Sequence, residues 1–412
     1  MTKYGFVYQG SKSKIADNII NILPRGNRFV DLFGGGFAIS HCAILCGKYK
    51  SVLFNEINSS IVDLIQKSIN GYYSDENRWI DKIDFKNLKE KEGYIKYVWS
   101  FSCGGKRYLY GETLKDYKKA LHFLYFFNDN QFFQNFGVTP PIFSNEFEKR
   151  KKEISKFIKR NAKEIRTKYI KYIIEKYDNK ELTIEKVENI IKNYSPNLEK
   201  EKLFNYLNNA LKESGLTSAE VSKKLKTNMN RHYFEKQQFS FPTFEMYKKL
   251  QEIIPLKEDY FEITNFYTIL NNLKFMLLND LNDMSKLSNL ARLENLKRLE
   301  KLKPFLDKIN FSNDTYKNYV YEKGDIVYCD PPYENTSVYN NTNFNHKEFY
   351  DWVASREYQV WFSSYDISDN RFYVVEEFQK QNLMSGKGNG KTMIEKIYTN
   401  KNEKFGQLSF NF

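Results

Sequence analysis

Short apolar runs near the N-terminus set the first pattern in this sequence. The runs at 28–33 and 52–57 predict buried β-strands, because each is too short for a typical helix and ends at glycine or polar residues. Segments with helical spacing follow them at 38–46 and 60–69, and an earlier helix is expected at 13–22. Alternation of strands and helices is typical of an α/β fold with a parallel sheet.

The last third of the chain repeats this pattern after a long helical stretch. Strands are expected at 326–329, 358–365 and 395–399, with a helix at 346–355. The stretch 263–306 predicts long helix with a possible break near 282–285. Its leucines recur at every third position: Leu287, Leu290, Leu293, Leu296, Leu299 and Leu302. Residues spaced exactly three apart shift gradually around the surface of a helix. We therefore expect a wide core-facing surface here rather than a coiled-coil seam.

The centre of the chain is highly charged. Residues 146–204 are rich in lysine and glutamate, which favours helices with a solvated face. Three shorter helices are expected within 203–255, at 217–225, 228–236 and 242–254, and a Thr-Ser-Ala-Glu capping box starts the first of them.

The segment 203–255 resembles a helix-turn-helix domain of the phage-repressor type. That resemblance implies that Arg231, His232 and Lys236 face a DNA major groove. A small helical bundle that only packs is the alternative.

Composition narrows the class of protein. The net charge of +13 favours a polyanionic partner, with a lysine-rich composition bias as the alternative. The four cysteines form no CxxC pair and the four histidines lie far apart, so we expect neither a zinc site nor a disulfide framework, and a cytoplasmic location. No apolar run approaches about 18 residues and no signal peptide is recognisable, so no membrane span is expected.

The heptapeptide VYCDPPY at 327–333 contains the most specific chemistry in the chain. Its apolar half should form a strand, and the prolines end the ladder because neither can donate a backbone hydrogen bond. Asp330 and Tyr333 should then project from the carboxyl end of a strand, where open α/β sheets bind their ligands.

An exocyclic amine on a nucleobase fits this motif. Its delocalised lone pair makes it a poor nucleophile, and acceptors for its N–H bonds bias the nitrogen toward tetrahedral geometry. Asp330 and the carbonyl of Pro331 supply two such acceptors, and the adjacent Pro332 completes the rigid turn. Tyr333 offers a flat face on which an extruded base can stack. An ordinary Pro-Pro turn is the alternative.

Together with RFVDLFGGG at 28–36 and YQGSK at 8–12, this motif makes the chain resemble the D12-class, Dam-like DNA adenine-N6 methyltransferases in their α-group motif order. The likeness is good over about 1–70 and 260–412, and looser over 71–145. It implies an α/β, Rossmann-like, S-adenosylmethionine-dependent methyltransferase sheet with a largely helical inserted DNA-recognition region. The implied reaction methylates N6 of a flipped adenine in double-stranded DNA. It needs no metal, because the sulfonium already makes the methyl group electrophilic.

The resemblance also implies a domain order. We expect the catalytic domain at 1–75 and 260–412, and a hairpin or helical target-recognition part at 76–145. The helical insertion then spans 146–260 and contains the helix-turn-helix-like segment.

Several positions match the family's cofactor motifs. The resemblance implies that Tyr8 and Lys12 lie where the opening segment closes over the methionine end of the cofactor, with a solvated lysine at a helix start as the alternative. Asp31, Phe33 and Gly35 match the acid and Phe-x-Gly pattern. The family's last glycine is replaced by a phenylalanine, which we interpret as a variant that tightens packing.

An acid follows the glycine turn at the spacing of a nucleotide-type fold. Glu56 lies 21 positions after Gly35, where an acid bonds the ribose hydroxyls of an adenosine cofactor. A surface glutamate is the alternative. Asp330 is expected to serve both the cofactor site and the catalytic site.

Residues 94–111 are rich in glycine and aromatics and predict a β-hairpin or loop. Within it, Lys106 and Arg107 are candidates for contacts with phosphates or a base edge, although a solvated loop is nearly as compatible with the sequence. Polar loops are also expected at 334–344, near the base, and at 385–391.

Other readings stay open from sequence alone. They are a cytosine-N4 or RNA amine methyltransferase, a glutamine methyltransferase, and a DNA-binding regulator with an inactive methyltransferase core. For an adenine methyltransferase we expect a monomer from a prokaryotic cell or phage, with a cognate restriction endonuclease as a candidate partner.

Overall fold

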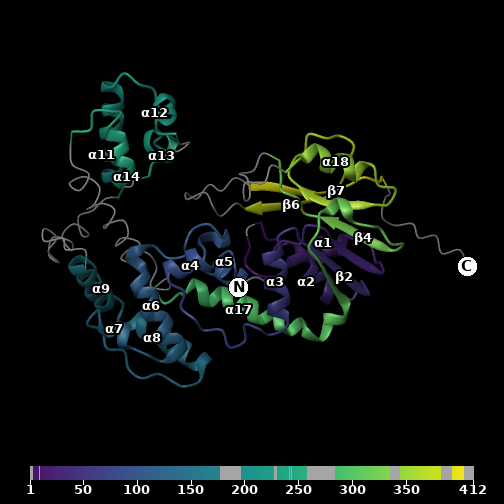
Figure 1. The fold of residues 1–412 in the computed structure, drawn as a ribbon, viewed down its shortest axis with the longest axis horizontal. Coiled ribbons are helices and arrows are strands. Elements are labelled where there is room, and N and C mark those ends of the chain that lie inside the picture. The colour runs from purple at the N-terminus through teal and green to yellow at the C-terminus, as the bar shows by residue number, and fades with distance from the viewer. Residues whose placement is uncertain are drawn as a thin grey trace, which may run out of the picture. The chain divides into compact units, whose positions relative to one another are not determined.

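The computed structural model describes residues 3–8, 10–176, 196–226, 230–240, 242, 244–257, 284–334, 344–381 and 392–402. The chain divides into two compact units (Figure 1). The first comprises Met1–Leu109 and Ser288–Phe412, and the second comprises Tyr110–Leu287. The functional boundaries expected from the sequence stay a prediction.

Within its described residues, the first unit is built on a seven-stranded sheet in the order β3-β2-β1-β4-β5-β7-β6. Neighbouring strands from β3 to β5 run parallel, whereas β7 pairs antiparallel with both β5 and β6. The strands are β1 (Arg28–Asp31), β2 (Ser51–Asn55), β3 (Ile309–Ser312), β4 (Asp325–Cys329), β5 (Val360–Ser364), β6 (Tyr373–Gln381) and β7 (Thr392–Thr399). The α/β fold class expected from the sequence is confirmed, and the strands from β3 to β5 have a Rossmann-like parallel arrangement.

Alternation along the central strands divides their side chains between two cores. On β4, Ile326 and Tyr328 join the core beneath α1 (Ala16–Ile22) and α2 (Ala38–Leu45). Val327 and Cys329 join the opposite core with α18 (His346–Ala354). Because both faces of the strand are covered, β4 is apolar throughout after its first residue, as buried parallel strands are.

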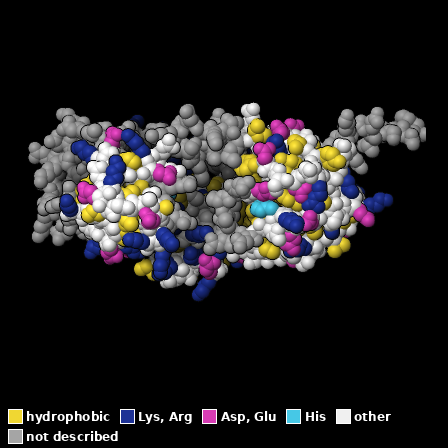
Figure 2. Space-filling view, turned by 90° about the horizontal axis from the view of Figure 1, so that it is seen from above, with side chains coloured by type: hydrophobic (Ala, Val, Ile, Leu, Met, Phe, Trp, Pro, Cys, Tyr) yellow, Lys and Arg dark blue, Asp and Glu magenta, His cyan; other side chains and the backbone are white. Residues whose placement is uncertain are grey.

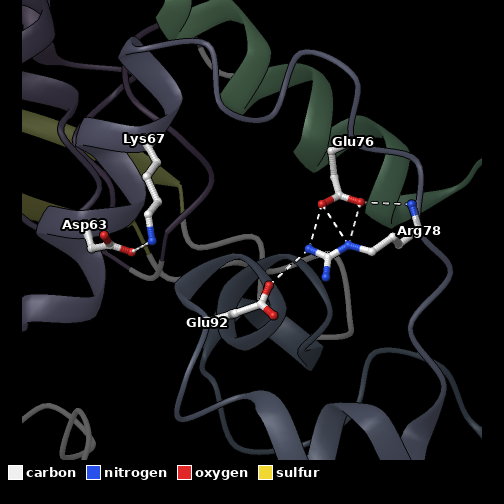
Figure 3. A network of polar contacts seen from close by, with 5 residues as sticks. All are labelled: Asp63, Lys67, Glu76, Arg78 and Glu92. Carbon is white, nitrogen blue, oxygen red and sulfur yellow. Dashed lines mark hydrogen bonds and ion pairs between the residues drawn. The ribbon is translucent and has the colours of Figure 1, made fainter.

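Further elements of the first unit pack against α3 (Ser59–Ile69). They are α5 (Gly93–Val98), α17 (Ser288–Leu299) and the 3-10 segment Glu300–Lys308, while α4 (Lys82–Leu88) packs against α5. All six leucines of the three-residue repeat are buried, so the expected core-facing surface is confirmed. The guanidinium of Arg78 binds both carboxylate oxygens of Glu76 and reaches Glu92 at the start of α5, and this network holds the segment that follows α3 (Figure 3).

All the regular secondary structure described in the second unit is helical. Its first part has α6 (Glu112–Phe127), α7 (Gln131–Gln134), α8 (Phe147–Arg160) and α9 (Ala162–Lys176). Its later part has α11 (Pro196–Glu213), α12 (Ser218–Leu225), α13 (Asn230–Phe234) and α14 (Phe244–Gln251). These last four helices share a core of their own between Leu203 and Leu256. The predicted capping box is present, since Thr217 and Glu220 bond each other's backbone N–H groups.

Some expectations about local structure were wrong. The β-hairpin or loop expected at 94–111 begins as helix α5 and then has a 3-10 turn, Phe101–Cys103, with one antiparallel bridge between Ser100 and Tyr108. Strands β3 and β6 were not expected, because neither has a clean apolar run in the sequence. The loops at 334–344 and 385–391, apart from Glu334 and Phe344, and residues 263–283 of the long helix lie outside the described residues.

An ion pair joins two strands that are almost 300 residues apart in the sequence. Arg28 and Asp325 stand opposite each other on β1 and β4, and the guanidinium donates to both carboxylate oxygens at 2.9 and 2.7 Å. The Asp325 side chain is only 2% exposed. Burial alone would raise its pKa, but Arg28 and two further donors hold that pKa below its usual value.

We therefore expect Arg28→Met to destabilise the first unit by about 3 kcal/mol, because it leaves a buried carboxylate without its cation. Urea unfolding at neutral pH measures the change. The matched control is Lys67→Met, which breaks the exposed Asp63–Lys67 pair on α3 and should cost less than about 0.5 kcal/mol. Equal losses in the two variants would contradict this role for Arg28.

Candidate functional site

A cavity of about 660 Å³ opens at the carboxyl edge of the parallel strands. Four acids from adjacent strand ends line it, in the order of the sheet: Asp314 after β3, Glu56 after β2, Asp31 at the end of β1 and Asp330 after β4. The amide of Asn55 ties three of these ends together, since it donates to the carbonyls of Leu32 and Asp314 and accepts from the Asp314 N–H. Sheet order therefore gathers acids that are far apart in the chain.

The glycine turn after β1 forms one wall of the cavity. A side chain on Gly34 would lie 2.0 Å from the ring of Phe54, and one on Gly36 would lie 2.6 Å from Cβ of Tyr8, so both positions need glycine. Phe37, which replaces the family's last glycine, still has the glycine-like φ of 66°. Its buried ring packs edge-on against Phe54 at 4.9 Å, which agrees with the interpretation that it tightens packing.

Backbone N–H groups hold the carboxylate of Glu56 in place. Its carboxylate accepts the backbone N–H groups of Gly35 and Asn58, both at 2.9 Å. Burial raises its pKa, and these two N–H groups counteract that rise. The carboxylate is thus fixed at the cavity wall with further lone pairs available, and the neighbouring side chain of Ile57 is 69% exposed there.

Asp31 has an unsatisfied carboxylate oxygen. Its Oδ2 accepts from the Ser40 hydroxyl at 2.7 Å, whereas its buried Oδ1 has no hydrogen-bond partner among the described residues. Burial raises the pKa of Asp31 to about 7, and the nearby Asp330 and Glu56 add to the rise. A buried, unsatisfied acid on a cavity wall is costly unless a ligand supplies a donor or a positive charge.

The segment before α1 brings Tyr8 and Lys12 to the cavity. Tyr8 packs edge-on against Tyr97 at 5.8 Å. The Lys12 ammonium lies 2.7 Å from Oδ2 of Asp330 and 3.4 Å from Oε1 of Glu395 on β7. Lys12 is therefore buried in an ion cluster, and the alternative of a solvated lysine is wrong.

The DPPY residues lie as expected at the end of β4, and all four line the cavity. The Tyr333 hydroxyl bonds Oε1 of Glu395 at 2.8 Å and Oδ1 of Asp330 at 3.1 Å, while its ring lies 4.8 Å from the Lys12 ammonium. The ring of His346 bonds the Pro332 carbonyl at 2.9 Å, which stabilises the turn.

One lysine cannot neutralise both neighbouring carboxylates. Burial lowers the pKa of the Lys12 ammonium, but Asp330 and Glu395 more than offset this and raise it, so the lysine stays charged. Burial raises the pKa of Asp330, Lys12 lowers it and Glu395 raises it again, with a net increase. Asp330 is consequently a more basic acceptor than an ordinary aspartate.

Sequence reasoning missed three members of this site. Asp314 and Tyr316 line the cavity, but they follow strand β3, which was itself unexpected. Glu395 was noted only as the start of a strand. Its spacing of two from the buried Ile397 was a signal that it faces the protein interior.

The candidate DNA contacts are not among the residues that line the cavity. Lys106 and Arg107 are exposed on the loop after α5, and the Arg107 guanidinium lies 5.2 Å from the ring centre of Phe101. Arg292 on α17 donates to the carbonyls of Val98 and Ser100, which holds the base of this loop.

The other candidates belong to the second unit. Arg231 is in helix α13, but its side chain lies outside the described residues. His232 bonds the carbonyl of Gln238 at 3.2 Å through its ring, and Lys236 forms an exposed ion pair with Glu201 at 2.7 Å. An exposed pair of this kind contributes little to stability, so Lys236 can exchange partners easily.

Residues 8–195 match the family model of the D12 class N6 adenine-specific DNA methyltransferases. Over these residues the chain is similar to the D12 class. The match supports an enzyme that methylates adenine N6 in DNA site-specifically, and methyltransferases of this family use S-adenosylmethionine as the methyl donor. Nothing supports the cytosine, RNA, glutamine or inactive-regulator alternatives. No curated protein matches the sequence.

The matched range ends well before Asp330. The contact between Lys12 and Asp330 nevertheless joins the matched N-terminal motif to the unmatched DPPY motif in one cavity. In the part of the chain that the structure describes, no helix is long and apolar enough to cross a membrane, and no cluster of three metal-binding side chains occurs.

Proposed function

We propose that the cavity binds S-adenosylmethionine along the row of acids and receives the target adenine beside Asp330. The observation that carries this proposal is the cavity itself, in which the glycine turn, Glu56 and the Lys12–Asp330 pair all meet. When bound, the cofactor supplies a methyl group made electrophilic by its sulfonium. We further propose that no metal takes part, since a sulfonium needs no Lewis acid.

The residues present fit such a cofactor. The unsatisfied Oδ1 of Asp31 is complementary to an ammonium group, which the methionine end of the cofactor carries. Glu56, already oriented by two backbone N–H groups, has lone pairs left for ribose hydroxyls. The close packing at Gly34 and Gly36 supports an approach of the ligand to the backbone of the turn. Phe33 and Tyr8 supply apolar wall.

The amine is activated by acceptors rather than by a strong base. The Asp330 carboxylate and the Pro331 carbonyl accept its two N–H bonds, which directs the nitrogen lone pair toward the methyl group. The raised pKa of Asp330 strengthens it as an acceptor. The ring of Tyr333, half-buried on the cavity wall, offers a stacking surface for the extruded adenine.

We propose that double-stranded DNA is held by Lys106 and Arg107 and read by the helix-turn-helix segment through Arg231, His232 and Lys236. On the face drawn in Figure 2, lysine and arginine side chains lie among acidic ones rather than in one large patch. The net charge of +13 thus supports DNA binding in general and does not single out one surface.

Other expectations remain proposals. Action as a monomer is one of them. All four cysteines are free of disulfides, which supports a reducing, cytoplasmic location in a prokaryotic cell. A restriction endonuclease with the same target site would be its partner in a restriction-modification pair.

We expect Asp330→Ala to lower the single-turnover rate of methyl transfer at least about a hundredfold, because the amine loses a preorganised acceptor. The assay is incorporation of tritiated methyl groups into DNA, with thermal unfolding to verify the fold. The matched control is Asp366→Ala, which removes an exposed acid after β5 and should retain full activity. A rate within tenfold of wild type for Asp330→Ala would remove Asp330 from this role.

We expect cofactor binding to release a proton from Asp31. At pH about 7 this carboxyl is roughly half protonated, and a ligand ammonium favours its charged form. The affinity for S-adenosylhomocysteine should then rise as pH increases through about 7 and level off above it. Calorimetry in buffers of different ionisation enthalpy measures the proton release, which Asp31→Asn should abolish. Equal release from both proteins would assign the proton to another group.

We expect the two DNA-contact regions to respond differently to substitution. If Arg231 reads a base edge, Arg231→Ala should change which sites are methylated, since a bidentate contact discriminates by about 1–3 kcal/mol. If Lys106 and Arg107 contact phosphates, their double alanine variant should weaken binding equally on all sequences and reduce the salt slope by about two. Sequencing of methylated DNA from an expressing, methylation-free host and a salt titration of binding measure the two effects. An unchanged result from either variant removes that region from the interface.

A further inference from the structure

A fully buried carboxylate lies directly behind the proposed catalytic residues. Glu395 is 0% exposed and lies in β7, which is hydrogen-bonded to β5 and β6. The cavity is lined by Lys12, Asp330 and Tyr333 but not by Glu395 itself. Glu395 therefore cannot touch a ligand in the cavity, and any effect on the reaction must pass through the side chains in front of it.

The position of Glu395 makes its charge unusual. Its neighbour Lys396 points to the other face of the hairpin and pairs with Glu377 and Asp366 near the surface. Ile397, two residues on, belongs to the core beneath α1 and α2. A carboxylate on this core-facing side loses its hydration, so it is tolerated only with compensating partners.

Glu395 contacts two residues that line the cavity. Its Oε1 accepts the Tyr333 hydroxyl at 2.8 Å and lies 3.4 Å from the Lys12 ammonium. The hydroxyl bond anchors the far end of the Tyr333 ring, while Tyr365 packs edge-on against the same ring at 4.8 Å. The plane of the ring is thus fixed before any base arrives.

The second consequence concerns Asp330. The Lys12 ammonium lies 2.7 Å from Asp330. In an isolated pair, this ammonium would neutralise the negative charge of the carboxylate. Glu395 competes for the same ammonium from the other side. Because the ammonium also interacts with Glu395, it neutralises less of the negative charge on Asp330. Asp330 therefore remains a stronger acceptor for an incoming N–H donor.

We infer that Glu395 is a positioning residue for methyl transfer, which orients Tyr333 through its hydroxyl and shares the Lys12 ammonium so that Asp330 stays a strong acceptor. This inference rests on the proposed roles of Asp330 and Tyr333. It assigns no contact between Glu395 and adenine or cofactor. It makes the β6–β7 hairpin part of the catalytic support.

The test is Glu395→Gln, which keeps the shape and an acceptor oxygen but removes the charge. We expect the single-turnover rate constant to fall about ten- to hundredfold, as loss of a charge-assisted contact does. The dissociation constant of S-adenosylhomocysteine should stay within about threefold of wild type, because Glu395 does not line the cavity. The loss should therefore appear in kcat and not in KM for the cofactor.

The pH profile separates this role from a merely structural one. Activity should fall as pH drops through the raised pKa of Asp330, because the carboxylate is the active form. Glu395 contributes to that raised pKa, so Glu395→Gln should move the acidic limb to lower pH. The titratable groups that act on or respond to Asp330 are Lys12, Glu395, Tyr333, Tyr328, Cys329 and Asp31. Asp31 and Lys12 are unchanged in the variant, so a shift of the limb reports the loss of Glu395.

Two further variants complete the design. Tyr333→Phe keeps the ring but removes the hydroxyl, and its effect should be non-additive with Glu395→Gln because the two groups act through one bond. Glu377→Gln is the matched control on the same hairpin, where an exposed partner of Lys396 is lost, and it should retain the wild-type rate.

The outcomes are distinguishable. If wild type and Glu395→Gln share the same rate and the same acidic limb, the inference is wrong while the proposed site stands. If Asp330→Ala is as active as wild type, the proposed site itself is wrong. If Glu395→Gln does not fold, Tyr333→Phe decides alone, and a wild-type rate for that variant overturns the inference.

Discussion

The ion cluster around the Lys12 ammonium is the constraint on which the cavity of the first unit depends. It joins three parts of the chain that are far apart in sequence or in sheet order: the segment before α1, the turn after β4 and strand β7. An ammonium buried to this degree is stable only when carboxylates surround it in good geometry. Each of the three parts must therefore be in its final place before the cluster can form, and catalysis is linked to the completed fold.

Two features of the sheet make that cluster possible. The strand order brings β4 directly beside β1, so that Asp330 lies next to the glycine turn although 299 residues separate Asp31 from Asp330. The antiparallel β7 then inserts between β5 and β6 and carries Glu395 toward the same edge. The Arg28–Asp325 pair fixes the β1–β4 register at the opposite end of these strands. A slip of one residue there would turn Asp330 to the other face of the sheet.

The division of the chain into two units leaves the cavity within one of them. The residues that line the cavity all belong to the first unit, which has a parallel sheet covered on both faces. The helices between Pro196 and Gln251 have their own small core and no residue in the cavity. Surface residues of such a region can be substituted without disturbing the acids of the cavity.

The local motifs determined much of this protein from sequence alone. Each of these motifs depends on interactions within a few residues, so its local structure could be predicted from the sequence. They are the strand-ending DPPY, the triple-glycine turn, the acid after the second strand and the capping box at Thr217. The buried leucine repeat from Leu287 to Leu302 followed from its period for the same reason.

What only the tertiary structure decided was which of these pieces meet. Strand β3 lacks a clean apolar run, and its place at the edge of the sheet depends on pairing with β2 across more than 250 residues. The first part of 94–111 became helix because packing against α3 outweighed its glycine and aromatic content. The sequence placed Lys12 near the cofactor and Glu395 on a strand, but it did not show that the two side chains form an ion pair. Lys12 and Glu395 become buried, and contact Asp330 and Tyr333, only in the folded sheet. The sequence does not show this, because charge pairing depends on distance in space and not on spacing along the chain.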